Sequence, residues 1–254
     1  ILDTEQYLRN DELKIFRGED FIVSKHIRIH QATLGEIVDY GEKEYFSLLN
    51  GILATPQSMK AQLWKAGEID YTEIKPFDLY WTILYKLYTP EQTSILFGDL
   101  DFRKFEVYQD EKDGSVSLCQ NIDGDLVKID EYTYEVIMDY LSKSHFIKRD
   151  LKIPMNNSTK MILIEDAIED LERNKNKEYH SYLKNLISTL TNTSGFKFSH
   201  SQIWGMKINA FMDSVKRIGK IKNVDLLLQS GYSGFGVNLK EISSSQLDRF
   251  GELE

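Results

Sequence analysis

The sequence is poor in cysteine and has no long apolar run, and these scarcities exclude several classes of protein. The single cysteine, Cys119, cannot form an internal disulfide, so the chain is no disulfide-stabilised scaffold and suits a reducing compartment. No stretch approaches the roughly 18 apolar residues that a membrane-spanning helix needs, and no signal peptide is visible. We therefore expect a cytoplasmic location and no membrane partner. Because the chain opens on Ile1, we also expect at least an initiator methionine before it.

Positive charge is scarce as well. The chain has 31 Lys and Arg against 40 Asp and Glu, a net charge of −9. This balance repels phosphate backbones, so we expect no nucleic-acid partner. Of the 254 residues, 41% are hydrophobic and 12% are aromatic. That composition is typical of an ordered globular protein with one large or two smaller domains.

Helical periodicity dominates residues 33–97. Thr33 and Glu36 have the spacing of a capping box, which satisfies orphan amides at a helix start. Gly41 predicts a break, because glycine costs about 1 kcal/mol in a helix interior. Three further helices are predicted to begin at prolines, whose fixed φ suits a first turn: Pro56, Pro76 and Pro90. The second of these carries an apolar stripe in which we expect the central Trp81 to be largely buried: Phe77, Tyr80, Trp81, Leu84 and Tyr88.

Two segments show the two-residue alternation of β-strands. The run KHIRIH, residues 25–30, predicts one short strand. Further on, β-favouring residues flank Asp113–Gly114, a strong hairpin signal, and a turn at Asp123–Gly124 introduces Leu126–Ile129. We expect a small antiparallel meander over about 102–129. The predicted fold class is therefore α+β, predominantly α-helical with a small antiparallel β-meander in the middle.

The remaining chain is predicted to be helical. Asp130 is placed to cap a helix, and residues 146–160 have the polar, proline-containing composition of a linker. We therefore expect an N-terminal helical domain with the meander, residues 1–145, and a helical C-terminal domain, residues 161–254. One C-terminal helix is predicted from a stripe that runs from Tyr179 through Tyr182 to Leu190. A second is predicted from Ile208 to Ile218, with Gly219 ending it, followed by a short helical turn at Leu226–Gln229.

The sharpest candidate for chemistry is the pair Asp99 and Asp101. Two carboxylates two residues apart in a loop can hold Mg²⁺ or Mn²⁺, although such a site needs further oxygen ligands. The simpler interpretation is that both are turn residues between buried Phe97 and Phe102.

Other candidates have incomplete patterns. His26 and His30 would need further zinc ligands if they lie on a strand. Ser233 in GYSGFG lacks the second glycine of a nucleophile elbow, and Cys119 has no basic neighbour to activate it. The Asp–Gly segments contradict the ligand pattern of a calcium loop and are predicted to be hairpin turns. We expect no catalytic residue, no metal site and no cofactor.

Two basic segments interrupt the acidic chain, residues 143–152 and 216–222. We predict that the second lies at a helix C-terminus, where cations interact favourably with the helix dipole: Lys216, Arg217, Lys220 and Lys222. The alternative is that these side chains contact an acidic protein partner.

Four segments carry a resemblance to a known group of proteins: TLGEIVDYGEKEYFSLLNGILATP (33–56), ILFGDLDFRKFEV (95–107), MKINAFMDSVKRI (206–218) and GYSGFGVNL (231–239). In order and spacing they resemble proteins encoded among the tail genes of siphophages of Gram-positive bacteria, a tail assembly chaperone-like family. The resemblance is weakest over residues 1–25 and 145–180. Its motifs are structural and not catalytic.

The resemblance implies a non-enzymatic tail morphogenesis factor in the cytoplasm of the bacterial host. Its simplest role is to keep the tape-measure protein, or another tail protein, soluble; a host defence protein is a further candidate partner. Two alternatives stay open, a structural component of the tail or neck and a metal-dependent enzyme that uses Asp99 and Asp101. Candidate partner-binding residues are Tyr179, Tyr182, Lys216, Arg217, Tyr232 and Phe235. For the two stripe tyrosines, burial in the core is the alternative interpretation.

Overall fold

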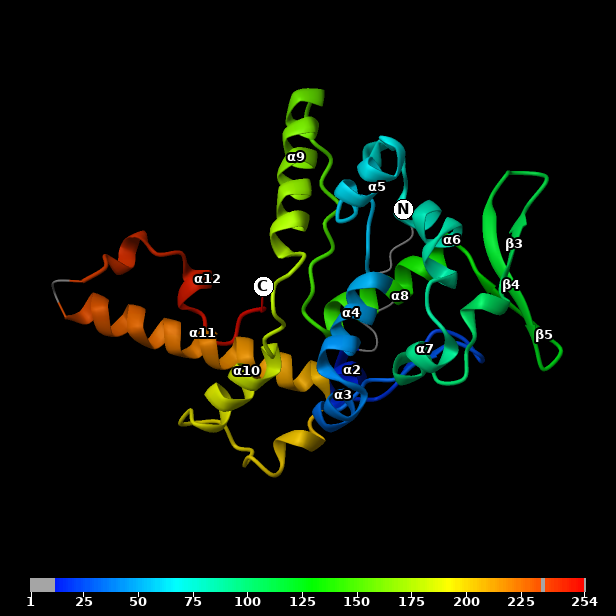
Figure 1. The fold of residues 1–254 in the computed structure, drawn as a ribbon. Coiled ribbons are helices and arrows are strands. Elements are labelled where there is room, and N and C mark those ends of the chain that lie inside the picture. Colours follow the sequence, from blue (N-terminus) through cyan, green and yellow to red (C-terminus); the bar gives the residue numbers. More distant parts are fainter. Residues whose placement is uncertain (1–11, 234–235, 254) are drawn as a thin grey trace.

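The computed structural model describes residues 12–233 and 236–253. Figure 1 shows a mainly helical α+β fold with a small sheet at one end, which confirms the predicted fold class. The helices are α2 (Glu12–Arg17), α3 (Leu34–Tyr40), α4 (Glu42–Ile52), α5 (Lys60–Gly67), α6 (Pro76–Thr82), α7 (Pro90–Phe97), α8 (Glu131–Ser144), α9 (Asn157–Asn174), α10 (Tyr182–Thr191), α11 (Ile208–Tyr232) and α12 (Ser244–Leu247). The strands are β1 (Phe21–Ile22), β2 (Arg28–Ile29), β3 (Glu106–Gln109), β4 (Val116–Ile122) and β5 (Asp125–Ile129). No helix within the described ranges is both long and apolar enough to span a membrane.

The capping box and the glycine break are confirmed. Thr33 Oγ1 accepts the Glu36 N–H at 3.1 Å, and Glu36 Oε2 accepts the Thr33 N–H at 2.6 Å. Gly41 separates α3 from α4 with a φ of +107°, a conformation that other residues rarely adopt. The break turns α4 relative to α3, so that α4 lies in the middle of the molecule.

Two of the three proline predictions are confirmed, at the first turns of α6 and α7. The prediction at Pro56 is wrong, because α5 begins only at Lys60. The Thr55 N–H donates to Ser58 Oγ at 2.9 Å and the Ser58 N–H donates to Thr55 Oγ1 at 3.1 Å, which closes a separate turn before the helix.

The expected burial of Trp81 is confirmed in part, because its side chain packs against the core without being fully buried. Helix α6 ends at Thr82, so the predicted stripe does not continue as one helical face. The indole is only partly buried, and its Nε1–H donates to Asp78 Oδ1 at 3.1 Å near the surface. A short helix followed by a change of direction therefore leaves part of the Trp81 side chain exposed.

The meander is confirmed, with antiparallel order β3-β4-β5. Its turns lie where the Asp–Gly segments predicted them, and Gly114 and Gly124 have φ angles of +72° and +87°. The strand predicted in residues 25–30 is shorter than expected: only Arg28–Ile29 is extended, and it pairs antiparallel with Phe21–Ile22. Asp130 caps α8 by accepting the Thr133 N–H at 2.9 Å, as predicted.

One contiguous hydrophobic cluster runs through the molecule, from Phe21 to Met212. Helix α8 is central to it and buries seven of its residues. Phe21 stacks on Tyr140 with ring centroids 4.4 Å apart, and Tyr80 lies 4.9 Å from Tyr134. The cluster contains residues from both sides of 146–160, and the division into two domains stays a prediction.

The two C-terminal helices are confirmed, but α10 begins later and α11 ends later than predicted. Ser181 caps α10 by accepting the Lys184 N–H at 3.0 Å, so the helix begins at Tyr182 and Tyr179 lies in the preceding loop. Helix α11 does not end at Gly219 but continues to Tyr232, so Leu226–Gln229 belongs to it. Its second half, with residues 236–253 folded back on it, forms a projection that we call the arm (Figure 1). Val224 is fully buried in the arm, and this packing offsets the cost of about 1 kcal/mol for a helical glycine.

Candidate partner-binding cleft

An apolar cleft of about 320 Å³ lies where α4, the end of α8, the start of α10 and the start of α11 meet. Its apolar lining is Phe46, Phe146, Ile147, Tyr182, Ile208 and Met212. Asn50, His145 and Tyr179 complete it. Helix α4 buries Tyr45, Leu48 and Leu49 in the core, which leaves the neighbouring Phe46 at the edge of that face and open to the cleft.

The floor of the cleft contains a buried histidine whose ring nitrogens both have protein partners. His145 Nδ1 lies 2.9 Å from the Leu141 carbonyl oxygen, so Nδ1 carries the proton and donates it. The Tyr45 hydroxyl then donates to Nε2 at 2.6 Å. Burial lowers the pKa of His145 to about 4, which keeps the ring neutral. Because neither nitrogen is available, the floor offers a ligand an apolar surface and no acid or base.

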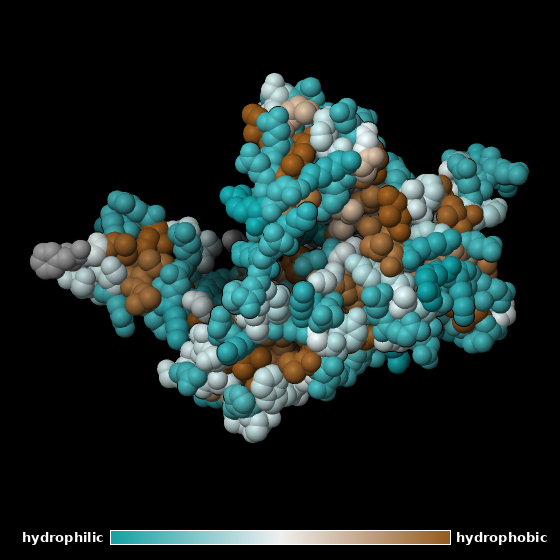
Figure 2. All heavy atoms as spheres, viewed as in Figure 1, coloured by the Kyte–Doolittle hydropathy of each residue, from teal (hydrophilic) through white to brown (hydrophobic). Residues whose placement is uncertain are grey.

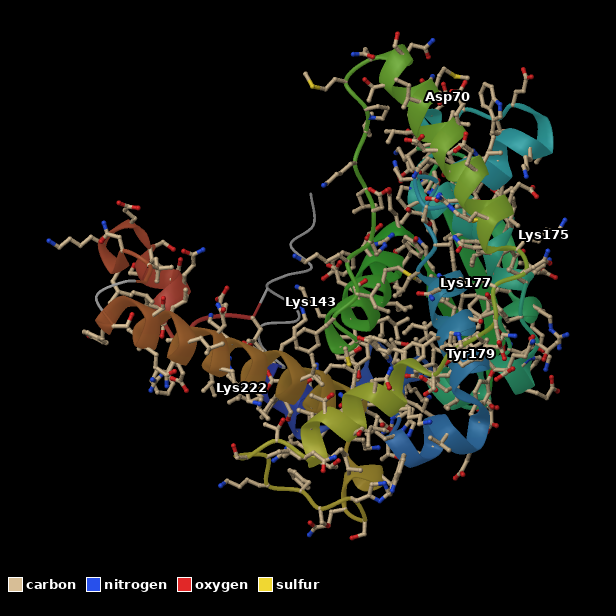
Figure 3. All side chains as sticks on the ribbon, turned by 60° about the vertical axis from the view of Figure 1, so that its left-hand side comes forward. Asp70, Lys143, Lys175, Lys177, Tyr179 and Lys222 are labelled. Carbon is tan, nitrogen blue, oxygen red and sulfur yellow. The ribbon has the colours of Figure 1, made fainter. Side chains whose placement is uncertain are left out.

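Two tyrosines lie at the mouth of the cleft. Tyr182 is 50% exposed and packs edge-on against Phe46, with ring centroids 5.8 Å apart. Tyr179 is 43% exposed and lies in the chain segment that follows α9 (Figure 3). The start of α10, which follows that segment, is tied to α4, because Glu42 Oε1 accepts the Leu183 N–H at 2.7 Å. Burial, and then the charges of Glu42 and Glu44, raise the pKa of the Tyr179 hydroxyl.

The predicted partner-binding residues divide between the cleft and the arm. Tyr179 and Tyr182 line the cleft, and the Lys216 ammonium lies 5.2 Å from the Phe146 ring centroid. Arg217 instead faces the arm, where its Nη1 donates to the carbonyl oxygens of Arg249 and Gly251 at 2.9 Å each. Phe235 lies outside the described residues.

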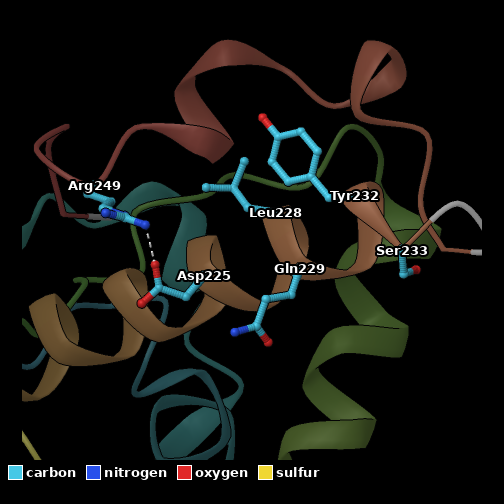
Figure 4. Close-up of a pocket in the computed structure, with 6 residues that line it drawn as sticks. All are labelled: Asp225, Leu228, Gln229, Tyr232, Ser233 and Arg249. Carbon is cyan, nitrogen blue, oxygen red and sulfur yellow. Dashed lines mark hydrogen bonds and ion pairs between the residues drawn. The ribbon is translucent and has the colours of Figure 1, made fainter.

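Tyr232 lines a second, more open hollow of about 510 Å³ on the arm (Figure 4). An ion pair of 2.5 Å between Arg249 and Asp225 closes one end of this hollow. The prediction that the basic segment lies at a helix C-terminus is wrong, because α11 continues well past Lys222. The packing of residues 236–253 against the helix, which the local sequence does not reveal, extends it.

Three of the four residues considered for metal binding, Asp101, His26 and His30, have other partners. Asp101 caps a 3-10 helix, Phe102–Lys104, by accepting the Arg103 N–H at 3.1 Å, while Asp99 is exposed. The two histidines lie beside different carboxylates, His26 at 2.8 Å from Asp125 and His30 at 2.8 Å from Asp20. Over the ranges 12–233 and 236–253, no group of three or more His, Cys, Asp or Glu side chains is arranged to hold a metal ion.

Sequence reasoning missed the walls that α4 and α8 supply, above all Phe46 and Phe146. A signal existed for Phe46, which is an aromatic residue one position off the buried stripe of α4. The sequence held no such signal for Phe146. This residue follows the end of α8 with a φ of +55°, and the direction of its side chain depends on that turn.

Apolar side chains also reach the surface away from the cleft. Figure 2 shows them in separate patches among polar residues, on one face of the molecule. Along the chain that leads into α9, Ile153 and Met155 are 67% and 98% exposed.

One part of the chain is similar to a known family, and this similarity suggests a bacteriophage-related protein. Residues 174–245 match the family described as the YomV second domain, a phage-associated family. The match begins where α9 ends and includes α10, α11 and all six predicted partner-binding residues. No curated protein and no solved structure matches the chain.

Proposed function

We propose that the protein is a non-enzymatic tail morphogenesis factor that binds an apolar segment of the tape-measure protein, or of another tail protein, in the host cytoplasm. The observation that carries this proposal is the apolar cleft with two half-exposed tyrosines at its mouth. A long helical protein with apolar stripes needs such a surface until it is assembled, because exposed apolar patches drive association.

The chemistry of the cleft suits protein binding better than catalysis. Its volume of about 320 Å³ has room for one large or two small apolar side chains. Aromatic residues and methionine, here Phe46, Phe146, Tyr182 and Met212, are enriched where proteins bind one another. The one titratable ring in the floor is neutral and already hydrogen-bonded on both sides.

The phage part of the proposal is supported by the family match, which covers the tyrosines and the α11 wall of the cleft. The tail part rests on the resemblance of the four segments to tail-region proteins. A structural role in the tail or neck is the alternative, and it uses the same surface.

The test is complementation of a phage from which the gene is deleted. Tyr179→Ser and Tyr182→Ser should each weaken partner binding by more than about 1 kcal/mol if they are anchors, and together they should abolish assembled tails. Tyr108→Ser is the matched control, because Tyr108 is 56% exposed on β3, far from the cleft in the fold. Pull-down of the co-expressed tape-measure protein measures the binding directly.

The alternatives give different results. Tails lost with Asp99→Asn/Asp101→Asn while both tyrosine variants complement would overturn the proposal in favour of a metal site. Detection of the protein in purified particles by mass spectrometry would replace the chaperone role with a structural one.

A further inference from the structure

We infer that β3 is an interaction edge at which two copies of this chain pair antiparallel, joining their small sheets into one. The twofold axis lies at Val107, and opposite charges near the two ends of the strand, on Lys104 and Glu111, set the direction of pairing. The sheet lies at the end of the molecule away from the arm (Figure 1). The inference goes beyond the proposed tail role, because it concerns a different surface.

Strand β3 has one side without a neighbouring strand. The sheet order is β3-β4-β5, and no strand among the described residues pairs with the outer side of β3. On the inner side, the Asp110 N–H donates to the Ser115 carbonyl oxygen at 2.9 Å. Because bonding directions alternate along a strand, Tyr108 also directs its backbone groups to β4, while Val107 and Gln109 direct theirs outward. The outer side therefore offers the N–H and C=O groups of both residues to another strand.

The strand lacks the features that usually protect an edge. Its register with β4 is uninterrupted from Glu106 to Gln109, so no bulge turns the edge away. It contains no proline or lysine, and all of its side chains are exposed, that of Val107 by 46%. At its base, Phe105 is fully buried and stacks on Phe102 with ring centroids 6.0 Å apart. The edge is therefore fixed in place and can pair without rearrangement.

The opposite edge of the sheet differs. Lys25 and His26, in the loop before β2, both contact Asp125 at the start of β5, with His26 Nε2 at 2.8 Å from the carboxylate. Lys128 lies within β5, and a lysine on an edge strand disfavours pairing with another chain. We therefore assign the pairing to β3 and not to β5.

The two ends of β3 carry opposite charges. Lys104 lies just before the strand and Glu111 just after it, and both side chains are exposed. The neighbouring Arg103 already pairs with Asp101. Lys104 and Glu111 form no ion pair with any described residue. In an antiparallel pair the start of one strand lies beside the end of the other, so the lysine of each copy comes near the glutamate of the second copy. A parallel pair would place like charges side by side.

Like charges also disfavour the neighbouring registers. A shift toward the start of the strand places Glu106 opposite Glu106 of the second copy. A shift toward the end places it opposite Asp110. With the axis at Val107, Glu106 faces Tyr108 of the second copy instead, and the outward groups of the two Val107 residues bond to each other.

The paired surface is small, so we expect a weak dimer. A strand of four residues covers far less than the roughly 1,200 Å² that stable complexes bury. The expected dissociation constant is on the order of 100 µM, in the range of transient contacts. Sedimentation velocity of the full chain from about 10 to about 500 µM should show the sedimentation coefficient rising toward that of a dimer. A monomer at every concentration would overturn the inference, and this measurement needs no variant.

Charge reversal tests the direction of pairing. Lys104→Glu and Glu111→Lys should each raise the dissociation constant about tenfold, because each turns an attraction into a repulsion at two symmetric places. The double variant restores opposite charges and keeps the net charge of −9, so it should dimerise within about threefold of the parent. If net charge alone mattered, Glu111→Lys would strengthen the dimer, and that result would overturn the inference.

Disulfide trapping tests the register. At the twofold axis the two Val107 Cα atoms would lie about 5.5 Å apart, a distance that a disulfide spans. In a Cys119→Ser background, Val107→Cys should cross-link about fivefold faster than Tyr108→Cys, whose two copies are offset along the strand. Both variants should cross-link at equal rates in urea, which controls for thiol reactivity. Equal rates in the folded chain, or faster cross-linking through Tyr108→Cys, would contradict pairing at Val107.

A strand donated by a tail protein is the other possible occupant of this edge. Val107→Pro removes an outward N–H and keeps the bonds to β4. Loss of the dimer in Val107→Pro, with the co-expressed tape-measure protein still captured, supports the inference. A parent that stays monomeric, together with loss of the tape-measure protein in Val107→Pro, would assign the edge to a donated strand. Tyr108→Ser keeps every backbone group of the edge, because the Tyr108 ring lies on a face of the sheet.

Discussion

At the scale of single residues, the most consequential group is His145 in the floor of the cleft. It is 5% exposed, accepts a hydrogen bond from the Tyr45 hydroxyl and donates one to the Leu141 carbonyl oxygen. A neutral imidazole in this position joins α4 to the end of α8, and thereby holds two walls of the cleft together. A protonated ring could not accept from Tyr45, so the network is tied to pH.

We expect acid to destabilise the fold through His145. Its pKa is about 4 in the folded chain against about 6.5 when unfolded, so the unfolded chain binds more protons between these values. The contribution of His145 to the free energy of unfolding is therefore constant above pH 6.5. It is lost as the pH falls toward 4, and the loss is about 3 kcal/mol at most. Urea unfolding of the parent and of His145→Gln between pH 4.5 and 7.5 measures it. Parallel pH profiles for the two proteins would contradict the expectation.

At the scale of elements, α9 buries the fewest side chains among the described helices of ten or more residues. Only Ile164 is fully buried among the 18 residues of α9. The helix packs mainly on α5. Ion pairs hold the α9 termini, Lys160 with Asp70 near the start and Glu172 with Lys65 near the end. Figure 3 shows Asp70 beside the upper part of α9. The contact of α9 with its neighbours therefore depends on ion pairs as well as on burial. The loop that follows α9 contains Tyr179.

We expect α9 to open locally before the rest of the fold. Hydrogen bonds from Lys160 and Thr72 lower the pKa of Asp70 to about 2, so this carboxylate stabilises the contact above pH 4 and loses its effect as the pH falls toward 2. Because the pair is partly exposed, Asp70→Asn should cost only roughly 0.5–1 kcal/mol. Hydrogen exchange at pH 7 should show a severalfold faster exchange confined to α9. Asp78→Asn, on α6, is the control. Unchanged α9 protection in Asp70→Asn would show that the Lys160–Asp70 ion pair does not secure the helix.

At the scale of the whole molecule, the arm extends from the core and is stabilised by its own packing. Arg217 and Lys220 donate to three backbone carbonyl oxygens of the C-terminal segment, those of Arg249, Gly251 and Glu252, at 2.8–2.9 Å. Arg217 was a candidate for partner contact from the sequence, and its place in the arm gives it an internal structural role. Partner binding by Arg217 stays a prediction.

We expect Arg217→Gln to loosen the arm without altering the cleft. Loss of the two hydrogen bonds should raise local opening about fivefold, equivalent to roughly 1 kcal/mol. Limited trypsin digestion should then cut after Arg249 severalfold faster. Lys222→Gln serves as the control on the same helix. An unchanged rate of cleavage would mean that the Arg217 hydrogen bonds do not hold the segment.

The sequence by itself determined the features that depend on near neighbours in the chain. The capping box at Thr33, the break at Gly41, both Asp–Gly turns and the Asp130 cap were predictable because each is fixed within about four residues by hydrogen bonds or by allowed φ angles. The α+β class followed from the change of hydrophobic period along the chain.

Only the tertiary structure decided where elements end and which side chains meet. Whether α11 stops at Gly219 depends on residues 236–253 packing against it, and whether Trp81 is buried depends on where the chain turns after α6. The cleft combines side chains from Phe46 to Met212, which no local pattern relates. Packing free energy outweighs local propensity at such points, because a propensity difference of about 1 kcal/mol is smaller than the gain from burying one large side chain.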